Sequence, residues 1–266
     1  MILHGDASSI PLSSDSVQAI ITSPPYANMR KKQYGGIPAH KYVHWFEPIA
    51  KELLRVLKPR GSFILNIKEN ANDGELSTYV LELILSMRKW GWLWKEEYIW
   101  YKLAGYPSAF PDRFPNTWER LLHFTKQKSI DFYKNSVLVK RDSVQVKTTN
   151  RAWSAKQPKN GNWWNKNNEN NFMLGKTHRQ PSNVLEVGTS GATKNSTFHP
   201  ATFPSRVPVF FINLFSLEGD LILDPFAGSG TTVQVAEKMA RVGVGLDINA
   251  DYVYEANKLM PQQRLL

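Results

Sequence analysis

Cysteine is absent from this 266-residue chain. Without a thiol, the protein can form no disulfide, no thiolate nucleophile and no cysteine-ligated zinc site, so its chemistry must use oxygen, nitrogen and aromatic groups. Long hydrophobic runs are also missing. The longest apolar stretch, Val207–Phe215, is too short to span a bilayer, and Met1–Asp6 shows no basic segment followed by an apolar one. We therefore expect a cytoplasmic protein with no membrane segment and no metal site.

Acidic residues are outnumbered by basic ones. The chain has 33 Lys and Arg against 23 Asp and Glu, which gives a formal net charge of +10. A basic protein favours a polyanionic partner such as nucleic acid, although many basic proteins bind no polyanion. Hydrophobic residues make up 42% of a chain long enough to bury a substantial core. Composition therefore predicts one or two globular domains that need no covalent cross-link.

The positive charge is concentrated in one segment. Lys126–Arg179 contains twelve Lys or Arg and three Asp or Glu, and seven of the twelve residues 160–171 are Asn. The segment shows no sustained periodicity, so one interpretation is a solvated surface insertion. The other is a nucleic-acid face with cations for phosphates, Asn for base edges and aromatic rings for stacking. We favour the second, because solvated loops seldom carry three Trp. The expected nucleic-acid contacts are Lys147, Arg151, Trp153, Lys156, Lys159, Trp163, Trp164 and Lys166.

The flanking sequence alternates between strand and helix patterns. Short apolar runs predict buried strands, and longer segments with one apolar face predict helices. The predicted strands are 17–22, 62–67, 92–100, 121–125, 221–223 and 242–246, and the predicted helices are 43–57, 76–89, 205–217, 231–241 and 250–260. Lys58–Gly61 is expected to stop the first helix. This alternation predicts an α/β protein with a doubly wound, mostly parallel sheet.

A glycine loop follows the predicted strand 221–223. Asp224–Thr232 reads Asp-Pro-Phe-Ala-Gly-Ser-Gly-Thr-Thr, and it lies at the carboxyl end of a strand, where doubly wound sheets bind ligands. Gly228 and Gly230 permit positive φ and close approach of a ligand, although a tight strand-to-helix turn alone would also explain them. Asp247 ends the next strand and is placed to accept hydrogen bonds from both hydroxyls of a ribose.

Two missing motifs narrow the ligand of this loop. The chain has no Gly-x-x-x-x-Gly-Lys-Ser/Thr sequence, which argues against a phosphate-cradling ATPase loop. Val233 stands three residues after Gly230, so the Gly-x-Gly-x-x-Gly fingerprint of dinucleotide binding is absent as well. A cofactor with a ribose and no pyrophosphate fits best, and S-adenosylmethionine is such a cofactor. Its expected contacts are Asp224, Pro225, Phe226, Ala227, Gly228, Ser229, Gly230, Thr231 and Asp247.

A second motif, Thr22–Tyr26 (Thr-Ser-Pro-Pro-Tyr), follows the first predicted strand. Two consecutive prolines fix a stiff turn, so one interpretation is a rigid loop whose Tyr26 belongs to the core. In the other, the Ser23 hydroxyl and the Pro24 carbonyl accept hydrogen bonds from an exocyclic amine while Tyr26 stacks on its ring. These acceptors would localise the lone pair of a weakly nucleophilic amine, which could then attack a sulfonium methyl directly. The expected catalytic residues are Ser23, Pro24, Pro25 and Tyr26.

Together, the two motifs resemble those of the amino-methylating DNA methyltransferases of the circularly permuted β class. In that order the catalytic motif comes first, the target-recognition region lies in the middle and the cofactor motif comes last. The resemblance covers nearly the whole chain, and it implies a Rossmann-like S-adenosylmethionine-dependent methyltransferase fold. Residues 1–125 would be the catalytic part, 126–195 the target-recognition insertion and 196–266 the cofactor-binding part.

Further segments resemble the same family. Gly5-Asp6 resembles the acidic strand end that faces the cofactor adenine, and His199–Pro204 resembles the motif that closes over the cofactor. Leu54–Gly61 resembles the helix and turn beside the target base. Ile99–Lys102 and Arg120–Phe124 resemble the strands that wall the target pocket. The resemblance therefore adds four residues to the expected cofactor site: Asp6, Phe203, Pro204 and Ile248.

The target atom rests on the resemblance. In this family a Ser at the position of Ser23 goes mostly with cytosine N4, whereas Asp or Asn goes mostly with adenine N6, and Phe203 in place of a lysine points the same way. Adenine N6 stays as the alternative. The absence of cysteine excludes the covalent route to cytosine carbon 5.

Other classes of function fit less well. RNA and protein amide methyltransferases use a similar pocket, but they more often carry Asn first and place the cofactor motif ahead of the catalytic one. A non-catalytic DNA-binding protein on the same scaffold would have no need of Ser23, Asp224, both loop glycines and Asp247. The resemblance further implies double-stranded DNA as the substrate, with a companion restriction endonuclease and a second copy of the chain as candidate partners.

Overall fold

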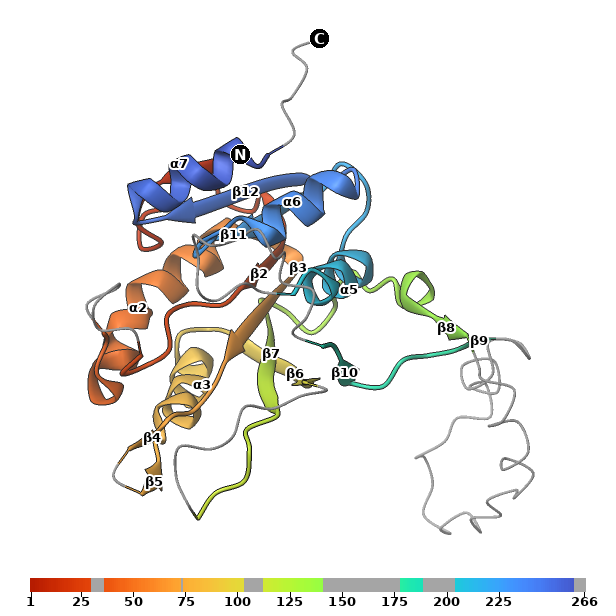
Figure 1. Cartoon of the computed structure of the whole chain (residues 1–266). Helices are drawn as coiled ribbons and strands as arrows, with labels where there is room; N and C mark the ends of the chain where they lie inside the picture. Colours follow the sequence, from red (N-terminus) through yellow and green to blue (C-terminus); the bar gives the residue numbers. More distant parts are fainter. Residues whose placement is uncertain (30–35, 73, 103–111, 141–177, 189–203, 261–266) are drawn as a thin grey trace, which may run out of the picture. The chain divides into compact units, whose positions relative to one another are not determined.

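Figure 1 shows a computed structural model of the whole chain. The structure describes residues 1–29, 36–72, 74–102, 112–140, 178–188 and 204–260. The chain divides into two compact units, one formed by 1–132 with 183–266 and the other by 133–182.

The larger unit is built on one sheet, which has eight strands among the described residues, in the order β1-β12-β11-β2-β3-β7-β6-β10. These strands are β1 (Ile2–His4), β2 (Val17–Thr22), β3 (Leu57–Ile67), β6 (Leu93–Tyr101), β7 (Trp118–Thr125), β10 (Val184–Glu186), β11 (Leu221–Asp224) and β12 (Val242–Asp247). Neighbours are parallel from β1 through β3 and between β6 and β10, and β7 is antiparallel to both β3 and β6. The predicted mostly parallel sheet is confirmed.

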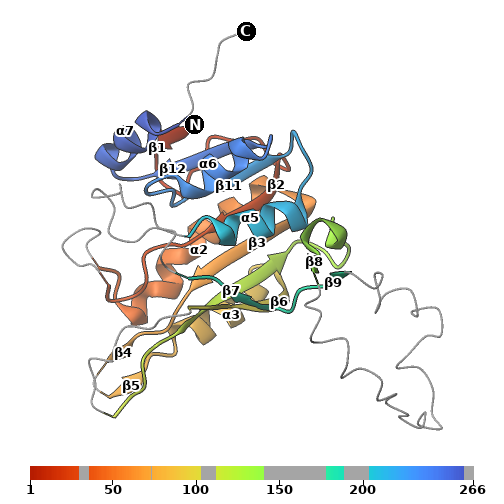
Figure 2. The same cartoon turned by 45° about the vertical axis from the view of Figure 1, so that its right-hand side comes forward.

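Helices cover both faces of the sheet (Figures 1 and 2). They are α2 (Ala39–Val56), α3 (Tyr79–Lys89), α5 (Arg206–Phe215), α6 (Thr231–Lys238) and α7 (Ala250–Lys258). Successive side chains of a strand point to opposite faces, and β7 shows what lies on each. On one face, Phe124 packs edge-on against Trp92, whose indole donates to the Ala50 carbonyl of α2. On the other face, the ring centroids of His123 and of Phe215 in α5 are 4.6 Å apart. The sheet is therefore doubly wound, as the alternating pattern predicted.

The core explains why the sequence signals were clear at these elements. All six residues of β2 are buried, as expected for a strand between two parallel neighbours with helices on both faces. The buried residues of α2 recur every three or four positions and form its apolar face. They are Tyr42, Phe46, Ile49, Ala50, Leu53 and Val56.

The segment Lys58–Gly61 ends the preceding helix, as predicted, but it forms the first part of β3 rather than a separate turn. The register between β2 and β3 shifts along this segment. A Cβ atom on Gly61 would lie 2.8 Å from the carbonyl oxygen of Gln18, so the close approach of the two strands requires glycine here.

Two helix starts also differ from the prediction. α2 begins at Ala39, four positions before the predicted Val43. Its first turn adds the polar His40 and Lys41 together with Tyr42, which extends the apolar face by one buried residue. α3 begins at Tyr79 rather than at Leu76, because Leu76 belongs to a short hairpin that turns at Gly74 with φ of 82°. The hairpin strands are β4 (Ala71–Asn72) and β5 (Glu75–Leu76).

The smaller unit is described only at residues 133–140 and 178–182. It contains a 3-10 helix, Lys134–Val137, and an antiparallel pair formed by β8 (Val139–Lys140) and β9 (His178–Arg179). The eight predicted nucleic-acid contacts, from Lys147 to Lys166, lie outside the described residues. The boundaries of the predicted insertion, 126–195, stay a prediction. In the part of the chain that is described, no helix is long and apolar enough to cross a membrane.

Candidate active site

The two sequence motifs meet at the carboxyl ends of β2 and β11. These strands are parallel neighbours, with Ala19 opposite Ile222 and Ile20 opposite Leu223. Where they end, the Thr22 hydroxyl donates a buried hydrogen bond of 2.6 Å to Oδ1 of Asp224, across 202 residues of sequence. The fold thus brings the Ser-Pro-Pro-Tyr motif and the glycine loop side by side.

The glycine loop is tied to the next strand. The Gly228 N–H donates to Oδ2 of Asp247 at 2.9 Å, and the Ala227 N–H donates to the Leu246 carbonyl at 2.8 Å. Gly228 and Gly230 have φ of 49° and 78°, in the left-handed region that glycine adopts without strain. The loop then leads into α6, whose N-cap is Gly230. Its conformation is set by glycine backbone and by one buried carboxylate.

Three carboxylates lie at the ends of three neighbouring strands. Asp224 ends β11, Asp247 ends β12, and Asp6 follows β1 by two residues. Asp247 is buried and accepts the Asn249 N–H at 2.9 Å besides that of the loop, but a carboxylate has lone pairs for about four hydrogen bonds. We call Asp6, Asp224 and Asp247 the acidic edge.

Burial alters the acidity of one member of this edge. The pKa of Asp224 is raised to about 6, mainly by burial and to a smaller extent by the charge of Asp247, although hydrogen bonds from Thr22 and the Phe226 N–H oppose both effects. A carboxylate held in such a site is destabilised when no cation faces it. The acidic edge therefore suits a ligand that carries positive charge.

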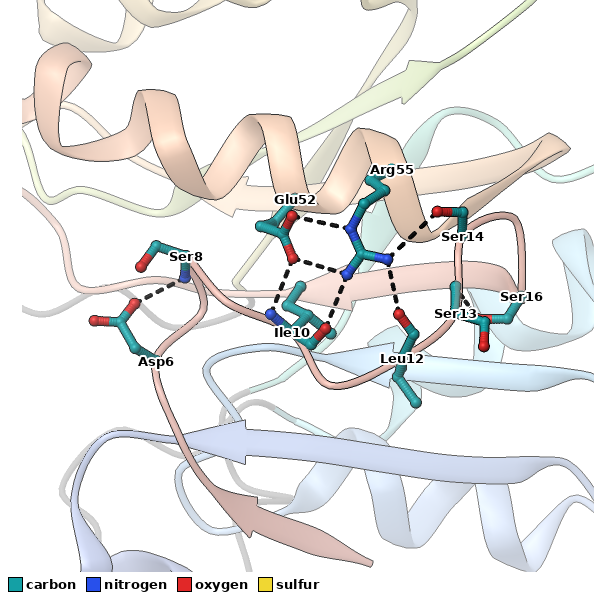
Figure 3. Close-up of polar contacts among 9 residues, drawn as sticks. All are labelled: Asp6, Ser8, Ile10, Leu12, Ser13, Ser14, Ser16, Glu52 and Arg55. Carbon is teal, nitrogen blue, oxygen red and sulfur yellow. Dashed lines mark hydrogen bonds and ion pairs between the residues drawn. The ribbon is translucent and has the colours of Figure 1, made fainter.

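The segment after β1 is anchored to α2 (Figure 3). The Arg55 guanidinium donates to the carbonyls of Ile10 and Leu12, each at 2.8 Å, and Glu52 accepts the Ile10 N–H at 3.0 Å. Glu52 and Arg55 also pair with each other, and that contact lowers the pKa of the Glu52 carboxyl. Asp6, which is exposed, accepts the Ser8 N–H at 2.7 Å at the start of this segment. Glu52 and Arg55 of α2 thus anchor the segment after β1, which begins with Asp6.

The Ser-Pro-Pro-Tyr turn packs partly into the core. The Tyr42 hydroxyl of α2 donates to the Pro25 carbonyl at 2.9 Å, and Pro24 is buried. Ser23 and Tyr26 are half-buried, and the Tyr26 ring packs against the core cluster on one side. The motif is therefore both a rigid exit from β2 and a partly open site, so it combines features of the two interpretations of the sequence.

Polar side chains that the sequence did not single out surround this motif. Oδ1 of Asn66 in β3 accepts a hydrogen bond from the Ser23 hydroxyl at 3.2 Å and lies within hydrogen-bond reach of the Tyr26 hydroxyl, at 2.8 Å. Glu119 of β7 lies 2.7 Å from the Tyr26 hydroxyl, and Lys102, just after β6, donates to the other oxygen of Glu119. Polar residues in otherwise apolar strands were the available signal, but nothing in the sequence brought these residues together.

Burial shifts the pKa values of two ionisable groups in and beside this cluster toward their neutral forms. Burial raises the pKa of the Tyr26 phenol well above its usual value, and the neighbouring Glu119 charge adds to the effect. Lys68 directly follows β3 and senses the same charges. Its pKa is lowered to about 8, mainly by burial and also by the charge of Lys102, although the charge of Glu119 opposes this shift. At neutral pH Tyr26 is therefore a neutral hydrogen-bond donor beside a carboxylate.

Three further residues predicted to bind the cofactor lie outside the glycine loop and the acidic edge. Phe203 lies outside the described residues. Pro204 is buried just before α5, and its carbonyl accepts the Val207 N–H at 3.0 Å. Ile248 is 64% exposed, and its carbonyl lies 3.1 Å from a ring nitrogen of His4. The structure therefore brings the glycine loop, the acidic edge and the Ser-Pro-Pro-Tyr motif to one edge of the sheet.

The arrangement of these two motifs at one edge of a mostly parallel sheet is that of a methyltransferase, and the sequence supports the same class. The chain is a member of the DNA methylase family of N6 and N4 methyltransferases, whose sequence pattern it matches over residues 17–258. The predicted resemblance and the predicted fold are confirmed. The protein is a DNA methyltransferase.

Individual relatives are similar along most of the chain. The type II methyltransferase M.PvuII of Proteus hauseri is 27% identical in an alignment of 264 positions that covers 90% of this chain and 76% of the relative. The type II methyltransferase M.ScaI of Streptomyces caespitosus is 30% identical in an alignment of 262 positions that covers 95% of this chain and 78% of the relative.

Solved structures show the same fold. The PvuII DNA methyltransferase, described as cytosine-N4-specific, superposes with a TM-score of 0.73 at 23% identity, covering 98% of this chain and 86% of that one. The complex of M1.HpyAVI with S-adenosylmethionine superposes with a TM-score of 0.57 at 19% identity, covering 97% and 98%.

Proposed function

We propose that this protein transfers a methyl group from S-adenosylmethionine to the N4 amine of cytosine at a specific site in double-stranded DNA. The observation that carries the proposal is the Thr22–Asp224 hydrogen bond. It joins the ends of two adjacent parallel strands, and this supports a reaction between an amine held by the Ser-Pro-Pro-Tyr motif and a methyl donor bound at the acidic edge. The choice of cytosine is supported by Ser23 at the first motif position and by the similarity to M.PvuII.

The acidic edge fits the proposed cofactor. Asp247 keeps lone pairs for ribose hydroxyls, and Asp6 lies beside it, because the Gly5 N–H donates to the Asp247 carbonyl at 3.1 Å. Gly228 and Gly230 leave the loop backbone open to close approach. S-adenosylmethionine, when bound, supplies an electrophilic methyl group on a cationic sulfonium. A cation beside Asp224 would stabilise the ionised carboxylate that burial disfavours.

Ser23 is poised to accept a hydrogen bond. Its own hydroxyl hydrogen is directed to Oδ1 of Asn66, which leaves the oxygen lone pairs for an amine hydrogen of the target base. The Pro24 carbonyl would take the second amine hydrogen, and Tyr26 would stack on the base after it leaves the duplex. The amine nitrogen would bond to the methyl carbon as the carbon–sulfur bond of the sulfonium breaks and leaves a neutral thioether, and the methylated amine would then lose one proton to water. Orientation and electrostatics supply the rate, with no covalent intermediate.

The partner assignments belong to the same proposal. The basic segment Lys126–Arg179 would contact the DNA phosphates. A companion restriction endonuclease is supported by the type II naming of relatives, although one relative is named an orphan methyltransferase. We also propose a cytoplasmic location and a homodimer, on the family resemblance alone.

Single-turnover methylation separates the proposed roles within the motif. Tyr26→Ala should lose stacking of roughly 1–3 kcal/mol, and a mismatch at the target should partly restore its rate by reducing a flipping cost of a few kcal/mol. Ser23→Ala should bind DNA and cofactor but transfer methyl slowly on matched and mismatched duplexes alike. The exposed Ser13→Ala is the matched control and should behave as wild type. Equal rescue of both variants, or a wild-type rate for Ser23→Ala, would refute the role of Ser23.

A further inference from the structure

A buried carboxylate beside the catalytic motif has no assigned role. Glu119 lies at the start of β7 and is 7% exposed. One of its oxygens faces the Tyr26 hydroxyl at 2.7 Å, and the other accepts a hydrogen bond from Lys102. Burying an ion pair is costly in free energy unless its hydrogen bonds are satisfied. This pair is satisfied, and one of its two contacts is to the aromatic residue of the Ser-Pro-Pro-Tyr motif.

The Tyr26 phenol has one hydrogen and two acceptors within reach. Asn66 lies at 2.8 Å and Glu119 at 2.7 Å, but an ionised carboxylate is the stronger acceptor. Burial and the Glu119 charge raise the pKa of the phenol, so it keeps its hydrogen across the neutral range. Asn66 makes two other contacts: its Oδ1 accepts the Ser23 hydroxyl, and its amide nitrogen donates to the Arg120 carbonyl at 3.2 Å.

Both ends of the Tyr26 side chain are therefore fixed. At the backbone end, the proline turn is held by the Tyr42 hydroxyl on the Pro25 carbonyl, and the Tyr26 carbonyl accepts the Met29 N–H at 3.2 Å. At the far end, the hydroxyl is held by Glu119. The phenolic hydrogen prefers to lie in the plane of its ring, so an acceptor fixed at Glu119 favours one ring plane even without a ligand. Such preorganisation removes part of the entropy lost when a base stacks on the ring.

We propose that Glu119, neutralised by Lys102, is a positioning residue for methyl transfer that sets the plane of the Tyr26 ring before the target base arrives. The inference rests on the proposed function, because it assigns the ring to the base that leaves the duplex. Glu119 acts only through Tyr26. It does not touch the reacting atoms.

The competing explanation is that Glu119 and Lys102 merely stabilise the sheet. β6 and β7 are already joined by a long antiparallel ladder that reaches Tyr101 and Trp118 beside the pair, so the sheet does not depend on this contact for its register. The two explanations differ in what happens when the Tyr26 hydroxyl is already absent. A double-mutant cycle therefore distinguishes them.

The cycle compares Glu119→Ala, Tyr26→Phe and the double variant in single-turnover methylation of a DNA duplex. Each single change should slow transfer by about tenfold to a hundredfold, the range for losing a hydrogen bond to a charged group. The double variant should be no slower than the slower single variant, because both changes remove the same contact. Glu119→Gln, which keeps an acceptor oxygen, should retain most of the rate. If Glu119→Ala fails to fold, Tyr26→Phe tests the same hydrogen bond from its other end.

The control is Glu97→Ala on the adjacent strand, which removes an ion pair with Arg120 but makes no contact with Tyr26. A mismatch at the target should partly restore the rates of Glu119→Ala and Tyr26→Phe, because both would have lost an ordered stacking surface. The ratio of mismatched to matched rates should be unchanged in Glu97→Ala. Thermal unfolding of each variant shows how much of any loss is structural.

Three results would overturn the inference while leaving the proposed function intact. They are a double variant slowed by the product of the single effects, a Glu119→Ala variant with wild-type rate, and an unchanged mismatch ratio in Glu119→Ala. A wild-type protein that methylates no DNA would overturn the proposed function, and this inference with it.

Discussion

Asp224 gives the most quantitative test of the acidic edge, because its environment opposes its charge. The side chain is 6% exposed, and burial raises its pKa from 3.8 to about 6. That displacement corresponds to roughly 3 kcal/mol of destabilisation of the ionised form in the folded protein. The protonated form is favoured by folding, so the contribution of Asp224 to the free energy of unfolding should fall as pH rises from about 4 through about 6.

Asp224→Asn isolates this effect. Both hydrogen bonds, from the Thr22 hydroxyl and the Phe226 N–H, go to the same oxygen, Oδ1, which an asparagine retains. Without cofactor at pH 7, the variant should be more stable than the wild type by up to roughly 3 kcal/mol. Below about pH 4 the two proteins should be equally stable, because the aspartic acid is then protonated in both the folded and the unfolded states.

Urea unfolding at a series of pH values from 4 to 8 measures the difference. The quantity to plot against pH is the difference in free energy of unfolding between variant and wild type, because the buried His123 gives both proteins a pH dependence of opposite sign. Burial lowers the pKa of His123 to about 3, so its contribution to stability falls as pH drops below about 6.5 in both proteins. The account is refuted if Asp224→Asn is less stable than wild type at pH 7, or if the difference does not change with pH.

Three further predictions concern the cofactor, the loop packing and the DNA. Asp247→Ala should weaken S-adenosylmethionine binding by about 1–3 kcal/mol in calorimetry, and an unchanged affinity would show that the ribose is misplaced. Gly245→Ala should lower the free energy of unfolding by about 1–3 kcal/mol, because its Cβ would lie 2.7 Å from that of Ala227; wild-type stability would contradict the packing. The plot of log K for DNA against log salt should flatten by about 0.9 per lysine replaced, with cofactor affinity intact, and an unmoved slope would exclude the basic segment as the phosphate-binding face. The lysines to replace together are Lys156, Lys159 and Lys166.

Much of the fold followed from local sequence signals. β2 and β11 are largely buried, so they appear as short, mostly apolar runs, and the motifs that follow them had to lie at the carboxyl edge. Local sequence patterns could not show that these two strands are neighbours, because they are about 200 residues apart in the chain. The family resemblance implied that the two motifs act together, and the hydrogen bond between Thr22 and Asp224 now shows their contact.

The polar cluster around Tyr26 could not be predicted for a related reason. Asn66, Lys102 and Glu119 come from β3, the end of β6 and β7, and they meet only because β7 lies antiparallel between the other two strands. A single sequence gives strand positions but not strand pairing, so each of these residues was only an isolated polar position. The short strand β10 was missed because its three residues have one buried side chain and no period to detect.

Identification of the methylated base tests the central claim most directly. The purified protein is incubated with double-stranded DNA and S-adenosylmethionine carrying a labelled methyl group, the DNA is digested to nucleosides, and the labelled nucleoside is identified by mass. The account predicts label in N4-methylcytosine, nearly abolished in the Ser23→Ala variant. Label in N6-methyladenine would contradict the assignment to cytosine, and DNA that acquires no label from an enzyme shown to bind the cofactor would contradict the proposed function itself.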